Sequence, residues 1–177
     1  MSEPKVIQGD PAKRRRVAVI ASRFNEFVVS GLIKGALASW TKHGGADADL
    51  LVARVPGAWE LPVVAGQLAR SGVYDAIVAL GAVIRGDTAH FEYVAGECAR
   101  GLQNVSIETG IPVIFGVLTT ETVEQALERA APNGSNKGGE AMEAALEMAD
   151  LLEKLEAIAV AAHPAAARAK QDPANVG

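Results

Sequence analysis

The sequence predicts one α/β domain in which helices cover both faces of a central parallel sheet. Short continuous apolar runs, typical of buried strands, alternate with longer segments whose apolar residues recur at helical spacing. The chain has 177 residues, of which 49% are hydrophobic, so it is long enough for a single domain with an adequate core. Strands that alternate with helices in this way favour a three-layer α/β/α arrangement.

Four apolar runs are the predicted core strands, at residues 16–21, 50–55, 75–81 and 112–118. The domain is predicted to span residues 1–156, with residues 1–15 as an N-terminal arm. Within that arm the apolar pair Val6-Ile7 could be an edge strand or a segment lent to a neighbouring subunit. Residues 157–177 are alanine-rich and then polar, and we expect a helix end followed by a mobile extension.

Helices are predicted in the intervals between these strands and after the last one. Asn25 is placed to cap the first helix, and the pair Gly44-Gly45 ends it. A second helix follows Trp59 and a third begins near His90. The chain break at residues 132–135 separates a short helix from a long final one.

Composition excludes several classes of protein. The net charge of −4 argues against a nucleic-acid-binding surface, and no apolar stretch reaches the roughly 18 residues that a membrane span needs. The single cysteine, Cys98, permits no internal disulfide, and the first residues lack the apolar core of a secretory signal, so we expect a cytoplasmic protein. The basic run at residues 13–16 is read as a solvated flank before a strand, with a phosphate-binding patch as the alternative.

Residues 81–91 are the most informative segment, because they connect a predicted buried strand to a helix. Ligands of open α/β sheets bind beyond the carboxyl ends of the strands. Gly86 and Thr88 suit an anion there, and the imidazole of His90 can transfer a proton near neutral pH. The segment therefore predicts chemistry on a phosphorylated small molecule. The other histidines, His43 and His163, are expected to face solvent.

Four further residues each have a functional and a structural interpretation. Phe24 could stack on a flat ring or pack in the core, and Glu60 could bind a ligand or only complement a helix N-terminus. Arg129 and Lys137 could bind an anion or serve helix ends. No metal-ligand spacing, GxGxxG or GxxxxGK[ST] motif occurs in the sequence, so we expect no metal and no dinucleotide or P-loop site.

Taken together, the motifs of this chain resemble the 6,7-dimethyl-8-ribityllumazine synthase family over roughly residues 5–155. They occur in the family's order and spacing: ASRFN at 21–25, VPGAWELP at 55–62, LGAVIRGDTAHF at 80–91, PVIFGVLTT at 112–120, EQALERA at 124–130 and NKG at 136–138. The resemblance implies a flavodoxin-like three-layer sandwich that assembles as pentamers, with active sites between adjacent subunits.

The resemblance also implies the reaction: condensation of 5-amino-6-(D-ribitylamino)uracil with 3,4-dihydroxy-2-butanone 4-phosphate, releasing phosphate and water, without cofactor or metal. Riboflavin synthase is a candidate partner on the same basis. By position, His90 is the proton shuttle. Substrate binding is assigned to Phe24, Ala58, Trp59, Glu60, Ala82, Val83, Ile84 and the neighbouring subunit's Phe115. Phosphate binding is assigned to Asp87, Thr88, Lys137 and the neighbouring subunit's Arg129.

Two positions depart from the family pattern. Asp87 stands where the family often has a small residue, and because a carboxylate would repel phosphate, we expect only its backbone N–H to face the ligand. Residues 131–135 replace a common Gly-Thr-Lys turn, so a second lysine often found there is missing.

Two questions stay open from the sequence. A non-catalytic shell or flavin-binding protein on the same fold is the alternative to an enzyme, and the presence of His90 and Arg129 favours the enzyme. The resemblance implies a ring of five subunits. In the family a compact link between the last two helices goes with closure of rings into a sixty-subunit shell, so the compact spacing from Arg129 to Lys137 favours the shell. Pro132 weighs against the shell, because proline fixes φ and could redirect the last helix.

Overall fold

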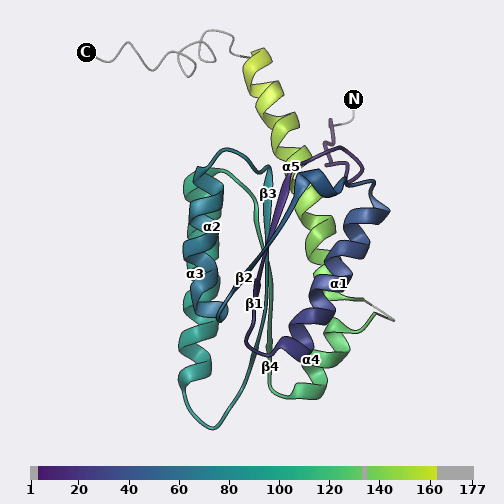
Figure 1. Ribbon diagram of the computed structural model, residues 1–177. Helices are drawn as coiled ribbons and strands as arrows, with labels where there is room; N and C mark the ends of the chain where they lie inside the picture. The colour runs from purple at the N-terminus through teal and green to yellow at the C-terminus, as the bar shows by residue number, and fades with distance from the viewer. Residues whose placement is uncertain (1–3, 133–134, 163–177) are drawn as a thin grey trace, which may run out of the picture.

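The computed structural model describes residues 4–132 and 135–162, which are organised around a four-stranded sheet. All strand pairs are parallel, and the strand order is β2-β1-β3-β4 (Figure 1). The strands are β1 (Val17–Ser22), β2 (Leu50–Val55), β3 (Ala76–Ile84) and β4 (Val113–Thr120). The predicted parallel sheet is therefore confirmed.

Helices form a layer on each face of this sheet. Figure 1 shows α2 (Leu61–Arg70) and α3 (His90–Thr109) on one side. The other side is covered by α1 (Glu26–Lys42), α4 (Val123–Ala130) and α5 (Lys137–Ala162). Short 3₁₀ turns, Asp47–Asp49 and Ala58–Glu60, precede β2 and α2. The three-layer α/β/α prediction is confirmed.

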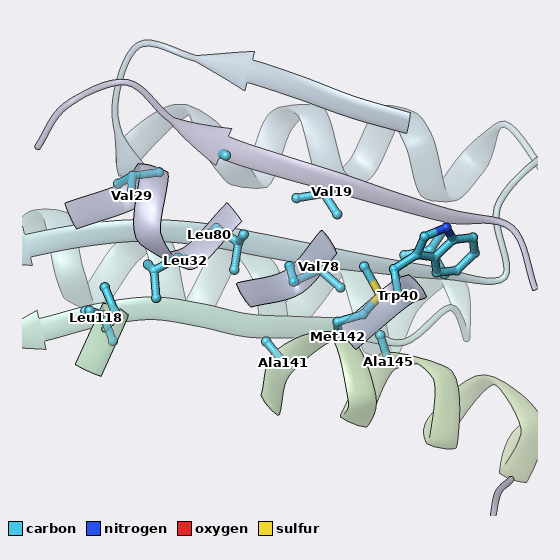
Figure 2. Packing of buried hydrophobic residues seen from close by; sticks show 14 of the residues in the cluster. Val19, Val29, Leu32, Trp40, Val78, Leu80, Leu118, Ala141, Met142 and Ala145 are labelled. Carbon is cyan, nitrogen blue, oxygen red and sulfur yellow. The ribbon is translucent and has the colours of Figure 1, made fainter. Parts of the chain in front are cut away.

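The core consists of two apolar clusters, one on each face of the sheet. Because strand side chains alternate between faces, Val19 of β1 packs toward α1 and α5, whereas the next residue, Ile20, packs toward α2 and α3. Figure 2 shows the first cluster, in which Val19 and Val78 lie near Trp40 and Met142. Burial of both faces explains why β1 and β3 have continuous apolar sequences.

The structure corrects two strand predictions. Residues 50–55 form a strand but not a core strand, because β2 lies at the edge of the sheet and Val52 remains 39% exposed. Residues 81–84 were expected to begin a loop, but they extend β3, because Ala82, Val83 and Ile84 pair with Leu118, Thr119 and Thr120 of β4. The connection to α3 is therefore confined to residues 85–89.

The basic run at residues 13–16 is a largely exposed flank before β1, since the side chains of Lys13, Arg14 and Arg16 are 47%, 80% and 62% exposed, but two of its arginines are also held by buried carboxylates. Arg15, whose side chain is 9% exposed, donates to Asp150 of α5 at 2.9 Å. Arg14 pairs with the buried Asp49 at 2.7 Å. The run therefore fastens the N-terminal segment to the body of the domain through buried carboxylates.

The N-terminal segment lies along α5 and contains no strand within residues 4–16. Lys154 of α5 donates to the carbonyl of Gln8 at 2.9 Å, and the N–H of Asp10 donates to Asp150 at 2.8 Å. The pair Val6-Ile7 is thus not an edge strand of its own sheet, and its alternative role as an arm for a neighbouring subunit stays a prediction.

Two further expectations concern histidines and the C-terminal extension. His43 does not face solvent: its side chain is 12% exposed, and its Nε2 lies 3.6 Å from Glu143. Of the predicted extension, residues 157–162 continue α5. Residues 163–177, which include His163, lie outside the described residues.

Candidate active site

A cavity of about 480 Å³ opens at the carboxyl ends of β1, β2 and β3. Three chain segments meet there, each following one of these strands, as expected for a ligand site of an open α/β sheet. The lining residues are Phe24, Pro56, Gly57, Ala58, Trp59, Glu60, Ala82, Val83, Ile84, Gly86, Thr88, His90, Phe91 and Val94.

The turn from β1 to α1 presents Phe24 to this cavity. The ring is 70% exposed, which excludes the alternative that it packs in the core. The N–H of Phe24 donates to the carbonyl of Pro56 at 3.0 Å, and this bond ties the turn to the segment after β2. An exposed aromatic ring held by its backbone is suited to stack on a flat ligand.

Asn25 supports this turn in a way that the sequence did not predict. It occupies the first position before α1, but its side chain makes no capping bond. Its Nδ2 instead donates to the carbonyl of Ala82 in β3 at 2.9 Å. Its φ of 57° lies in the left-handed region, which asparagine tolerates better than most residues. Asn25 therefore joins the β1 and β3 sides of the cavity.

The segment between β2 and α2 contributes Ala58, Trp59 and Glu60. Trp59 is 57% exposed, whereas Ala58 is buried. The Oε2 atom of Glu60 accepts a hydrogen bond from the N–H of Gly57 at 2.8 Å. The carboxylate therefore closes the turn at the start of the helical segment, which agrees with the structural interpretation of this residue. Glu60 also lines the cavity, so its role in binding a ligand stays a prediction beside its structural one.

The connection between β3 and α3 contributes Gly86, Thr88 and His90 to the lining, whereas Asp87 is outside it. His90 is the first residue of α3, and its side chain is exposed. Its N–H lies 3.4 Å from Oγ1 of Thr88, at the helix start. The N-terminus of a long helix favours anions, so this end of the cavity suits a phosphate.

Arg85 begins the same connection and is surrounded by anionic partners. Its Nε donates to Glu121 at 2.7 Å, and its Nη1 donates to Glu92 in the first turn of α3. The hydrogen bond from Arg85 lowers the pKa of the Glu92 carboxyl below its usual range, and both carboxylates raise the pKa of the guanidinium. The guanidinium lies 4.2 Å from the centroid of the Phe91 ring.

Three predicted site residues lie away from this cavity within the single chain. Phe115 is on β4, opposite Ala79, and is 42% exposed. Arg129, in the last turn of α4, donates to the carbonyl of Gln125 at 2.9 Å. Lys137, the first residue of α5, pairs with Glu140 at 2.6 Å. One chain therefore brings together site residues from three segments, including His90, but it does not bring Phe115, Arg129 or Lys137 to the cavity.

Sequence reasoning missed four lining residues: Pro56, Gly57, Phe91 and Val94. Phe91 and Val94 belong to the apolar stripe of α3, which periodicity assigns to the core. Their position within the first five residues of α3, which begins at His90 just past the sheet edge, is the signal that could have separated them from the buried residues farther along the helix.

The family model for 6,7-dimethyl-8-ribityllumazine synthase matches residues 14–153, which include every segment that lines the cavity. The chain belongs to this family. Family members are transferases that form the lumazine intermediate of riboflavin biosynthesis from small-molecule substrates, and they assemble as homo-oligomers. Membership decides between the two alternatives left by the sequence, in favour of an enzyme.

No group of three or more His, Cys, Asp or Glu side chains in residues 4–132 and 135–162 is arranged to hold a metal ion. Over the same residues, no helix has the length and apolar character to cross a membrane.

Proposed function

We propose that this protein condenses 5-amino-6-(D-ribitylamino)uracil with 3,4-dihydroxy-2-butanone 4-phosphate to give 6,7-dimethyl-8-ribityllumazine, phosphate and water. The observation that carries the proposal is the convergence of Phe24, Trp59, Glu60, Thr88 and His90 on one cavity. These residues come from three separate segments, and they supply a stacking ring, a carboxylate, a hydroxyl and an imidazole.

The aminouracil is proposed to bind at the Phe24 side of the cavity. The exposed ring of Phe24 stacks on the pyrimidine, and backbone groups of residues 82–84 contact its polar edge. The carbonyl of Ala82 already accepts the amide of Asn25, so this part of the wall is held in place before substrate arrives. Glu60, with Ala58 and Trp59 beside it, accepts hydrogen bonds from the ribityl hydroxyls.

The butanone phosphate is proposed to bind at the start of α3. Thr88 and the backbone N–H groups of residues 86–88 donate to the phosphate, and the Asp87 carboxylate, which does not line the cavity, stays turned away from it. Charge-assisted hydrogen bonds from the neighbouring subunit's Arg129 stabilise the phosphate as it leaves. Lys137 pairs with Glu140 at 2.6 Å, and the remaining N–H donors of its ammonium can join them.

His90 is proposed to move the protons that the reaction requires. The substrate amine attacks the ketone to form an imine with loss of one water, and elimination of phosphate leaves an enol, which tautomerises to a ketone. The ribityl-bearing amine then attacks this ketone, and loss of a second water closes the ring of the lumazine. Each step needs a proton transfer, which imidazole performs near neutral pH. Proximity of the two bound substrates is expected to supply much of the remaining acceleration, up to about 7–11 kcal/mol in favourable cases.

The direct test is to mix the purified protein with both substrates and to follow lumazine fluorescence. We expect product to form without added cofactor and at the same rate in the presence of EDTA. A protein-free mixture is the control, because the two substrates can react slowly in water. A rate equal to this control would reject the proposed function.

Replacing Arg129 with alanine should raise the KM for the butanone phosphate far more than the KM for the aminouracil, because a charged hydrogen bond to phosphate is lost. Steady-state kinetics with each substrate varied in turn measures this difference. Arg70→Ala is the matched control, since Arg70 is an exposed arginine at the end of α2, remote from the proposed phosphate site. Equal increases in both KM values would make Arg129 a structural residue.

The proposed site requires a neighbouring subunit, because Phe115 and Arg129 do not line the cavity of their own chain. We propose that the subunits form a ring of five, as the family resemblance implies. We propose that twelve rings close into a sixty-subunit shell, on the compact spacing from Arg129 to Lys137. Light scattering and electron microscopy at neutral pH should show hollow spheres. A single five-subunit species would reject the shell but keep the ring, and a monomer would reject both.

A further inference from the structure

Arg85 is an arginine at the edge of the cavity with no assigned role in the chemistry. It is the first residue after β3, and its N–H donates to the carbonyl of Thr120, the last residue of β4, at 2.9 Å. Its backbone is therefore fixed to the sheet. Its side chain is 37% exposed and does not line the cavity, although it lies over the ring of Phe91, which does.

The side chain of Arg85 spans the connection that carries the proposed phosphate site. The contact with Glu92 and the stacking on Phe91 join the start of the connection to the first turn of α3. The hydrogen bonds within this stretch are short-range: His90 N–H to Thr88 Oγ1 at 3.4 Å, and Glu92 N–H to the carbonyl of Ala89 at 3.2 Å. Arg85 thus restrains the distance between the end of β3 and His90.

The second carboxylate partner extends this restraint to another element. Glu121 lies between β4 and α4, and its N–H donates to the side chain of Gln125 at 3.0 Å. The carbonyl of Gln125 in turn accepts Nη1 of Arg129 at 2.9 Å. A continuous series of contacts therefore runs from Arg85 through the start of α4 to the arginine at its end.

We infer that Arg85 is a positioning residue that sets the geometry of two half-sites, the loop with Thr88 and His90 in its own cavity and the helix that presents Arg129. The inference rests on the proposed function for the meaning of these two half-sites. Direct binding of phosphate by Arg85 is disfavoured, because two carboxylates already occupy its guanidinium and offset its charge. The planar fork and the stacking surface of arginine fit this arrangement, whereas lysine would reproduce only the charge.

The test uses Arg85→Met, which keeps an apolar stem over Phe91, together with Arg85→Lys, Glu92→Gln and Glu121→Gln. We expect Arg85→Met to lower kcat/KM by about tenfold, since small displacements of catalytic groups are costly, and Arg85→Lys to restore little of it. Glu92→Gln should mainly lower kcat through His90. Glu121→Gln should mainly raise the KM for the butanone phosphate through α4. Arg70→Met is the matched control for loss of an exposed arginine.

Hydrogen exchange of the full-length assembled protein provides a readout that does not depend on activity. Amides of residues 86–92 should exchange about tenfold faster in Arg85→Met than in the wild type, because the restraint on the loop is lost. Unchanged exchange together with unchanged kinetics would overturn the inference. A higher KM for the phosphate substrate with unchanged exchange would also overturn it, in favour of direct binding.

The wild-type activity separates this inference from the proposed function. If the wild type forms no lumazine, the proposed function fails, and the exchange rates alone uphold or overturn the restraint by Arg85. If the wild type is active and Arg85→Met matches it in kinetics and in exchange, only the inference on Arg85 fails.

Discussion

Replacing Asp150 with asparagine should lower the free energy of unfolding by about 3 kcal/mol, because it removes the charge from a buried ion pair and leaves the cation behind. The Asp150 side chain is fully buried. Its oxygens accept from Arg15 at 2.9 Å, from Lys154 at 2.6 Å and from the N–H of Asp10 at 2.8 Å. The loss is placed at the lower end of the expected range because Glu153 still pairs with Arg15.

Urea unfolding at one fixed protein concentration measures this loss, since stability of an oligomer depends on concentration. Glu153→Gln is the matched control. Its side chain is 50% exposed, and exposed ion pairs contribute at most about 1 kcal/mol. An equal decrease in the free energy of unfolding in the two variants would show that burial of Asp150 does not determine how much it stabilises the protein.

The same carboxylate predicts how stability depends on pH. Hydrogen bonding, first from Lys154, lowers the pKa of Asp150 from 3.8 to about 2. Because the folded pKa is below the unfolded one, the stabilisation is present above pH 3.8 and is lost as pH falls toward 2. The wild type should therefore lose stability over this interval more steeply than Asp150→Asn, as thermal unfolding at successive pH values can show.

Replacing His90 with alanine should lower turnover by about 10- to 100-fold, below or at the low end of the usual range for acid–base catalysis, because orientation of the substrates remains and water can carry protons. His43→Gln is the matched control, since His43 lies at the end of α1, away from the cavity. Turnover of the His90 variant should be measured from pH 6 to 8. A wild-type rate over that whole range would make His90 a structural residue.

Mixed assemblies of His90→Ala and Arg129→Ala subunits provide a second check of this site. If each site takes His90 from one chain and Arg129 from the next, about a quarter of the sites in a random mixture contain both residues. Co-expressed variants should then be more active than either variant alone. Activity no higher than the average of the two would place both residues in one chain's site.

The order of strands and helices could be predicted from the sequence, because each element buries a face and therefore carries a periodic or continuous apolar pattern. The last residues of a strand and its place at the edge or in the middle of the sheet could not be predicted. The last residues of β3, Ala82 to Ile84, are strand because β4 lies beside them. Leu50–Val55 is an edge strand because β2 is the outermost strand in the order β2-β1-β3-β4 of the described residues. Both facts depend on which strands are neighbours, and no local pattern records this.

The candidate site also has residues that could be predicted from the sequence and residues that only the structure places. Placement at a strand-to-helix junction was enough to single out Thr88 and His90. For Phe24 and Glu60 the residues left a functional and a structural interpretation open, and the family's motifs favoured the functional one and added Trp59. The structure shows that these residues line one cavity, and it adds Asn25 as the side chain that joins β1 to β3. The roles assigned to Phe115, Arg129 and Lys137 stay predictions, because they require a neighbouring subunit.

By itself, then, the sequence determined the fold class, the family and the residues that carry its motifs. Only the tertiary structure decided which charged groups meet. Arg85 pairs with Glu121, 36 positions away, and Arg15 pairs with Asp150, 135 positions away. The sequence shows that a charged side chain such as an arginine needs water or an anion beside it. Which anion it meets is decided by the packing of helices and strands, because this packing brings distant segments within hydrogen-bond distance.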